Sequence, residues 1–148
     1  MTIRARRRIA AATALTLALG GLALGATAAA HSLRATDTAH LRYLSGRGAL
    51  FHERGAAAGT LPGQMVVDMR IGARFSGSFT IYARGWSIAG RGSAAPKGEG
   101  IYESFSGTLS VTGGSGRYRR AHGTAKLYGV FNRRTYALVV QTVGTLLY

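Results

Sequence analysis

A glycine-rich segment separates two stretches of alternating polar and apolar residues in the last third of the chain. It runs from Val111 to Thr124 and contains Gly113, Gly114 and Gly116. Glycine adopts the positive-φ conformations of tight turns at little energetic cost. The segment therefore predicts a corner between two β-strands. Strand-like stretches on both sides, and no helical periodicity after the N-terminal leader, predict an all-β fold.

Residues 1–30 have the composition of an export signal. Arginines at positions 4 and 6–8 precede about 17 small or apolar residues, and Ala28–Ala30 supplies the small residues that signal peptidase recognises. The alternative is a transmembrane anchor, for which this Ala- and Gly-rich run is short. The three consecutive arginines leave twin-arginine export open, but no Phe-Leu-Lys pattern follows them, which favours general secretion. We expect a cleaved signal peptide and a secreted, extracytoplasmic protein.

Residues 31–148 have the length of one domain with one core. The chain has no cysteine, which excludes disulfides and a lipid-modified cysteine. Four of the 19 Lys and Arg lie in the leader, and all five acids follow it. Residues 31–148 therefore carry a net charge of +10. One explanation of this positive charge is the codon bias of a GC-rich genome, which favours arginine. The other is affinity for anionic wall polymers or membrane surfaces. The bases are scattered through the strands, so we expect no nucleic-acid partner.

Seven strands are expected in this domain, with a short eighth near 56–61 and a loose N-terminal arm over 31–39. The seven cover residues 41–52, 64–71, 73–84, 86–94, 101–112, 123–131 and 134–147. Residues 73–84 and 101–112 alternate clearly, so one face of each strand is expected in the core. Glycines inside several strands suit the sharp bends of a small coiled barrel.

The last strand is apolar on both faces. One set is Tyr136, Leu138, Val140, Leu146 and Tyr148, and the other is Ala137, Val139, Val143 and Leu147. A strand of this kind is usually buried on both sides. It is either a central strand of a sandwich or a barrel strand whose outer face is covered by another subunit. We therefore expect a homo-oligomer assembled through the C-terminal strand.

The glycine corner resembles a known family. Gly113-Gly-Ser-Gly-Arg-Tyr-x-x-Ala-x-Gly123 is similar to the Gly-Gly-Thr-Gly-x-Phe/Tyr-x-x-Ala-x-Gly segment of the dirigent and allene oxide cyclase-like barrel superfamily, and the resemblance is best over residues 101–148. It implies an antiparallel barrel of about eight strands with an apolar cavity, often trimeric. Plant members direct or catalyse the cyclisation of small hydrophobic molecules. The matched segment is a structural corner without catalytic groups, so it implies the fold and not the activity.

Glu103 is the best single candidate for a catalytic residue. It shares a strand face with Phe105 and Leu109. A carboxylate inside an apolar cavity costs several kcal/mol unless it is paired, or its pKa rises until it can act as an acid or base. The alternative is a position at the strand end, in contact with an arginine or with solvent.

Two sets of residues are candidates for binding. A hydrophobic ligand would contact Phe75, Phe79, Trp86, Glu103 and Phe105, although such aromatics are often plain core. An anionic group would contact Arg117, Arg119 and Arg120 on the corner, unless these are only solvated. The four histidines have no metal-site spacing, so we expect no metal, and no motif indicates a cofactor.

Three functions follow from these features. The first is a non-enzymatic barrel that binds a small hydrophobic molecule or an envelope component. The second is an isomerase or cyclase with Glu103 as acid or base. The third is a basic structural or adhesive protein of the cell surface. A cavity of roughly 300 Å³ or more would favour binding or catalysis inside the barrel, and a packed interior would favour the third function.

Overall fold

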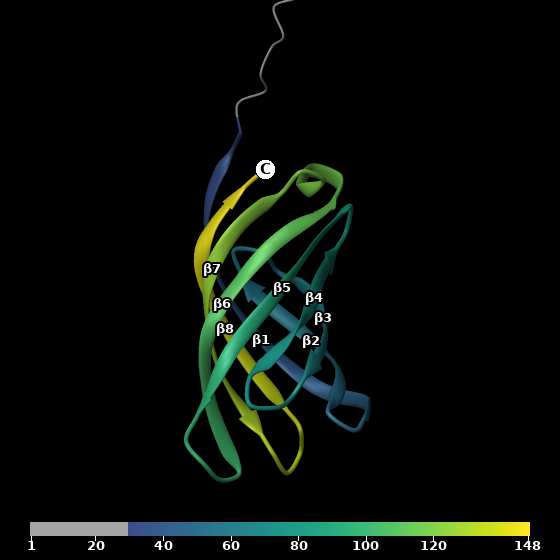
Figure 1. Cartoon of the computed structure of the whole chain (residues 1–148). Helices are drawn as coiled ribbons and strands as arrows, with labels where there is room; N and C mark the ends of the chain where they lie inside the picture. Colours follow the sequence, from purple (N-terminus) through teal and green to yellow (C-terminus); the bar gives the residue numbers. More distant parts are fainter. Residues whose placement is uncertain (1–29) are drawn as a thin grey trace, which may run out of the picture.

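The computed structural model describes residues 30–148, which form a closed antiparallel barrel of eight strands in sequential order (Figure 1). The predicted leader falls almost entirely on residues 1–29, outside this described part, and stays a prediction. The all-β barrel expected from the sequence is confirmed. The elements are β1 (Ser32–Arg47), β2 (Leu50–Gly59), β3 (Gly63–Arg70), β4 (Phe75–Ala83), β5 (Trp86–Lys97), β6 (Tyr102–Ser115), the 3₁₀ turn η1 (Gly116–Tyr118), β7 (His122–Asn132) and β8 (Leu138–Leu147).

Strand β1 closes the barrel, so the expectation of a loose arm over 31–39 was wrong. Its first ten residues pair with β8, from Ser32 opposite Leu147 to Leu41 opposite Leu138. This segment contains Ala35, Ala39 and Asp37, whose residue types are uncommon in strands. Its strand conformation therefore comes from pairing with a segment about a hundred residues away.

The expected single strand over 41–52 was also wrong, because a turn divides it between β1 and β2. Gly48 occupies this turn with a φ of +61°, a conformation that favours glycine. Strand β2 then continues to Gly59, so the short strand expected near 56–61 belongs to β2. The predicted corner begins later than expected. Strand β6 continues to Ser115, and the chain turns at Gly116, where φ is +59°.

Strand β8 is a barrel strand and begins at Leu138, four residues later than expected. The preceding turn is held by the Asn132 side chain, which accepts hydrogen bonds from the backbone N–H groups of Arg134 and Thr135 at 2.9 and 3.1 Å. Leu138, Val140 and Leu146 are buried inside the barrel. Val139, Val143 and Leu147 point outward and are half-buried.

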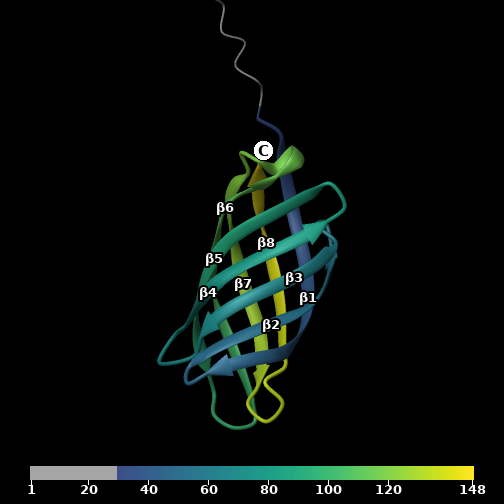
Figure 2. The same ribbon diagram turned by 90° about the vertical axis from the view of Figure 1, so that its right-hand side faces the viewer.

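The barrel is flattened and strongly coiled. Strands β2 to β5 cross in front of β1, β7 and β8 at a steep angle (Figure 2). Glycines inside the strands also allow a large side chain to lie over the neighbouring strand. At Gly129, an added Cβ would lie 2.2 Å from the Phe105 ring, which covers this glycine from the paired position on β6. A side chain at Gly129 would therefore displace Phe105 from the core.

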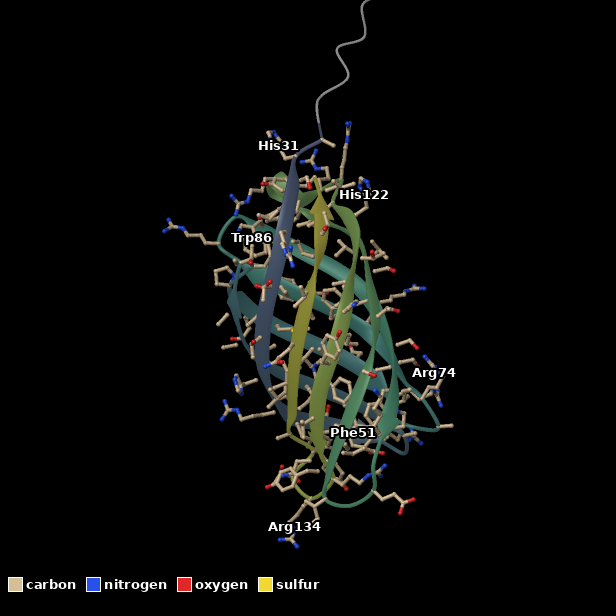
Figure 3. All side chains as sticks on the ribbon, turned by 90° about the vertical axis from the view of Figure 1, so that its left-hand side faces the viewer. His31, Phe51, Arg74, Trp86, His122 and Arg134 are labelled. Carbon is tan, nitrogen blue, oxygen red and sulfur yellow. The ribbon has the colours of Figure 1, made fainter. Side chains whose placement is uncertain are left out.

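Aromatic side chains fill both ends of the barrel. At one end, the Tyr118 ring lies 5.1 Å from Trp86 and 4.8 Å from Tyr148. At the other end, Phe51 lies 6.0 Å from Phe131 and 5.2 Å from Tyr136. Figure 3 shows Trp86 and Phe51 toward these opposite ends. The interior is thus covered at both ends by rings.

Candidate functional site

The interior of the described barrel contains two small apolar cavities. One has a volume of about 50 Å³ and the other about 70 Å³, and Phe79 and Leu109 line both of them. A pocket for a drug-sized ligand has a volume of roughly 300 Å³ or more, and one liquid water takes up about 30 Å³. The interior is therefore nearly filled by side chains.

The structure brings together three of the five residues expected to contact a hydrophobic ligand. Phe75, Phe79 and Phe105 line the 70 Å³ cavity. Trp86 lies at the far end of the barrel against Tyr118 and lines neither cavity. Glu103 also lies outside both cavity linings.

Glu103 points inward, as its strand face predicted, and is buried. Its Oε2 lies 2.5 Å from Nη2 of Arg133, which reaches it from the turn between β7 and β8 and is half-exposed. The contact brings two charges together but lacks the geometry of a hydrogen bond. Glu103 thus has the arginine partner at the strand end that the sequence left as its alternative environment.

Glu53 is one of two buried acids that the sequence analysis missed. Its side chain is 0% exposed, and neither carboxyl oxygen has a hydrogen-bond partner among the described residues. Its cross-strand neighbours are Tyr43 and Val67. Burial raises the pKa of Glu53 to about 8, so it is mostly a neutral acid at pH 7. It lines neither cavity, so this acid has no adjoining space for a substrate.

Asp37 is the only carboxyl group among the described residues that lines either interior cavity. Its Oδ1 accepts a hydrogen bond of 2.6 Å from the backbone N–H of Leu61. Burial raises the pKa of Asp37, and hydrogen bonds from the backbone of Leu61 and Thr60 partly offset this effect. The alternation of β1 would have placed Asp37 inside, had residues 32–40 been recognised as a strand.

The outer surface of the barrel carries almost only positive charge. All 15 Arg and Lys of the described residues are exposed, whereas three of the five acids, Asp37, Glu53 and Glu103, are buried. The remaining acids are Glu99 and Asp68, and an Asp68 carboxylate oxygen lies 2.6 Å from Nδ1 of His52. The charge that faces solvent is therefore more positive than the net charge of +10 that residues 31–148 carry.

The predicted anion-binding corner combines buried and exposed residues. Tyr118 is buried inside it, and the Arg117 guanidinium lies 4.8 Å over the Tyr118 ring. Arg119 and Arg120 are exposed, and among residues 30–148 neither is in an ion pair with a carboxylate. The corner is therefore a packed cap with two free arginines on its outside.

The described residues place no group of three or more His, Cys, Asp or Glu side chains where they could hold a metal ion. Over the same range, no helix is long and apolar enough to cross a membrane. Fold and surface together define a closed, nearly filled antiparallel barrel with a cationic exterior. No protein-family description, curated protein or solved structure matches the chain. Its membership of the dirigent and allene oxide cyclase-like superfamily stays a proposal.

Proposed function

We propose that this protein is an exported, non-enzymatic barrel that attaches to anionic polymers of the cell envelope through its outer surface. One observation carries the proposal. The described exterior presents 15 Arg and Lys side chains and only two acidic ones, one of which is paired with a histidine. A surface with one sign of charge creates a potential of several kT, which concentrates polyanions and speeds their association.

The interior gives less support to the other functions that the sequence suggested. Its cavities of about 50 and 70 Å³ are too small for the hydrophobic ligands of a cyclase or a carrier. The two glutamates inside the barrel are also poorly suited to catalysis. Glu53 borders neither cavity, and Glu103 faces the charge of Arg133. These features favour binding on the outside of the barrel.

Binding to isolated cell walls should therefore depend strongly on salt. We expect the purified protein to sediment with walls of its source organism in 50 mM NaCl and to be released in 1 M NaCl. The Debye length falls to about 3 Å in 1 M salt, which screens contacts between exposed charges. Sedimentation followed by protein quantification measures the bound fraction.

Neutral and anionic beads provide the control for this experiment. Dextran sulfate beads should retain the protein, and unmodified dextran beads should not. Equal retention on both, or wall binding that is unchanged in 1 M NaCl, would contradict the proposal. Export itself is tested by sequencing the N-terminus of the secreted protein, which we expect to be His31.

We also propose that the protein is a homo-oligomer joined through the outer face of β8. This face contains Val139, Val143 and Leu147, and Val139 pairs with Val130 of β7, which is 39% exposed. Replacing Val139 and Val143 by Lys should give a folded monomer, because both side chains point away from the core. Light scattering measures the mass, and circular dichroism measures the fold.

The charge-matched control for the assembly replaces two outward polar residues of β6, Thr108 and Ser110, by Lys. This variant should remain an oligomer, because both positions are polar and lie two strands from β8, with β7 between them. A wild-type protein that stays monomeric at high concentration would refute the assembly proposal.

A further inference from the structure

An open groove crosses the outer face of the barrel beside the turn between β1 and β2. Its volume is about 780 Å³, far larger than either interior cavity. It extends from the end of β1 across β2 to β5, the four strands that lie in front in Figure 2. Its arginines are Arg47, Arg70 and Arg91. None of the three was a candidate site residue in the sequence, because they lie in separate parts of the chain.

The strand register spaces these arginines across the groove. Arg47 pairs with Leu50, which in turn pairs with Arg70, so Arg47 and Arg70 lie two strands apart on β1 and β3. Arg91 lies another two strands away, on β5. Neighbouring strands are about 4.8 Å apart, so successive arginines are separated across the sheet by about 10 Å. Arg91 is also displaced by two residues along its strand, because the position of β5 that is level with Arg70 is Ser93. The groove thus presents three cationic groups in a staggered line.

The three guanidinium groups are available for a ligand. All three arginines are exposed, and none forms a side-chain hydrogen bond or ion pair within residues 30–148. The acid in the lining, Asp68, has its own partner in His52 at 2.6 Å. Serine hydroxyls at positions 45, 76 and 78 add neutral hydrogen-bond donors between the charges. This combination matches the oxygens of an anionic, hydroxyl-rich chain.

We propose that this groove binds an extended glycan-like or polyol polymer that carries phosphate or carboxylate groups along its length, with Arg47, Arg70 and Arg91 each holding one anionic group. The inference rests on the proposed function and assigns it to one site. Single-stranded nucleic acid usually stacks on exposed aromatic rings. The two aromatic rings of the lining, Phe51 and His52, are half-buried, and His52 is paired with Asp68.

The first test compares two variants that each lose three arginine charges, one inside the groove and one outside it. The groove variant is Arg47→Gln, Arg70→Gln and Arg91→Gln, and the control is Arg34→Gln, Arg84→Gln and Arg134→Gln, three exposed arginines outside the groove lining. Both variants have the same net charge. Binding of poly(glycerol phosphate) and of polygalacturonate is measured by calorimetry at several salt concentrations, which distinguishes phosphate from carboxylate recognition.

We expect the groove variant to bind its preferred polymer at least about tenfold more weakly than the control, because charge-assisted hydrogen bonds are lost. The slope of log K against log salt should become shallower by about 2 in the groove variant and by less than about 1 in the control. Thermal melting should be unchanged in both, since all six side chains are exposed.

A second test blocks the groove without changing its charge. Ser78 pairs with Arg91 and lines the groove, so Ser78→Tyr should fill the groove and weaken polymer binding. Thr108→Tyr, at an exposed position on β6 outside the groove, is the matched control and should bind as the wild type does. This pair separates the shape of the site from its electrostatic potential.

Four outcomes overturn the inference. Equal losses in the two arginine variants mean that charge alone holds the polymer, which refutes the groove but leaves the proposed function intact. A larger loss in Arg119→Gln with Arg120→Gln places the site at the corner. Wild-type binding to anionic phospholipid vesicles or poly(dT), without binding to either polymer, refutes the class of ligand. No binding to either polymer or to cell walls refutes both the groove and the proposed function.

Discussion

Raising the pH from 5 to 8 is expected to lower the free energy of unfolding by roughly 3 to 4 kcal/mol through Glu53 alone. Its pKa is about 8 in the folded protein and close to the ordinary 4.5 in the unfolded chain. Between these values the folded state keeps a proton that the unfolded state has lost, so each increase in pH favours unfolding. Below about pH 4.5 both states are protonated and the full stability is present. Above about pH 8 both are ionised and the loss levels off.

The variant Glu53→Gln should remove this dependence, because its amide does not titrate in this range. Urea unfolding at pH 5, 6, 7 and 8 should give similar values for the two proteins at pH 5 and a more stable variant at pH 8. The raised pKa of Asp37 acts in the same direction in both proteins, so it cancels in the difference. Glu99→Gln changes an exposed acid and should follow the wild type. Parallel curves for wild type and Glu53→Gln would show that Glu53 is solvated or paired in solution.

Which face of a strand points into the core was predictable wherever large apolar residues alternate with polar ones. In β4, Phe75 and Ile81 are buried and Ser76 and Ser78 are exposed, as their order in the sequence indicates. The same rule placed Glu103 inside the barrel. Alternation succeeds here because one face of the strand packs on the core and the other faces water, which gives a side-chain period of two.

The first two strands were poorly predicted because alanines and acids interrupt the large apolar residues on their inward faces. Ala39 and Ala57 are buried, and Asp37 and Glu53 share their inward faces. Nothing local in such a pattern marks a core strand, since alanine and acids are depleted in sheets. The closure of β1 against β8 is a long-range pairing. The burial of Asp37 and Glu53 was therefore recognised only in the folded sheet, where strand pairing determines which side chains point inward.

Of the candidate anion sites too, only the one whose residues are neighbours in the sequence was predictable. The corner arginines were recognised because they are neighbours in the sequence, within Arg117–Arg120. The groove arginines come from β1, β3 and β5 and meet only through the register of the folded sheet. Composition had already indicated a basic protein. The burial of three of its five acids, which makes the exterior almost purely cationic, follows from side-chain direction and not from composition.

Replacing Tyr118 by Ala is expected to lower the free energy of unfolding by about 3 to 5 kcal/mol, the usual effect of removing a large buried aromatic side chain. Tyr118 is 1% exposed and packs between Trp86 at the start of β5 and the C-terminal Tyr148. Its loss leaves a cavity at this end of the barrel and removes the ring beneath the Arg117 guanidinium. The corner, β5 and β8 would then lose their common contact.

Tyr118→Phe is the control, because it keeps the ring and removes only a hydroxyl group that has no hydrogen bond among residues 30–148. It should cost less than about 1 kcal/mol. Trp86 is the only tryptophan, so its fluorescence reports on this end of the barrel during urea unfolding. In the folded Ala variant its emission should shift to longer wavelength, since water reaches the indole once the neighbouring ring is gone. An Ala variant with wild-type stability and emission would mean that the corner does not close the barrel in solution, and that access to the interior must be sought at this end.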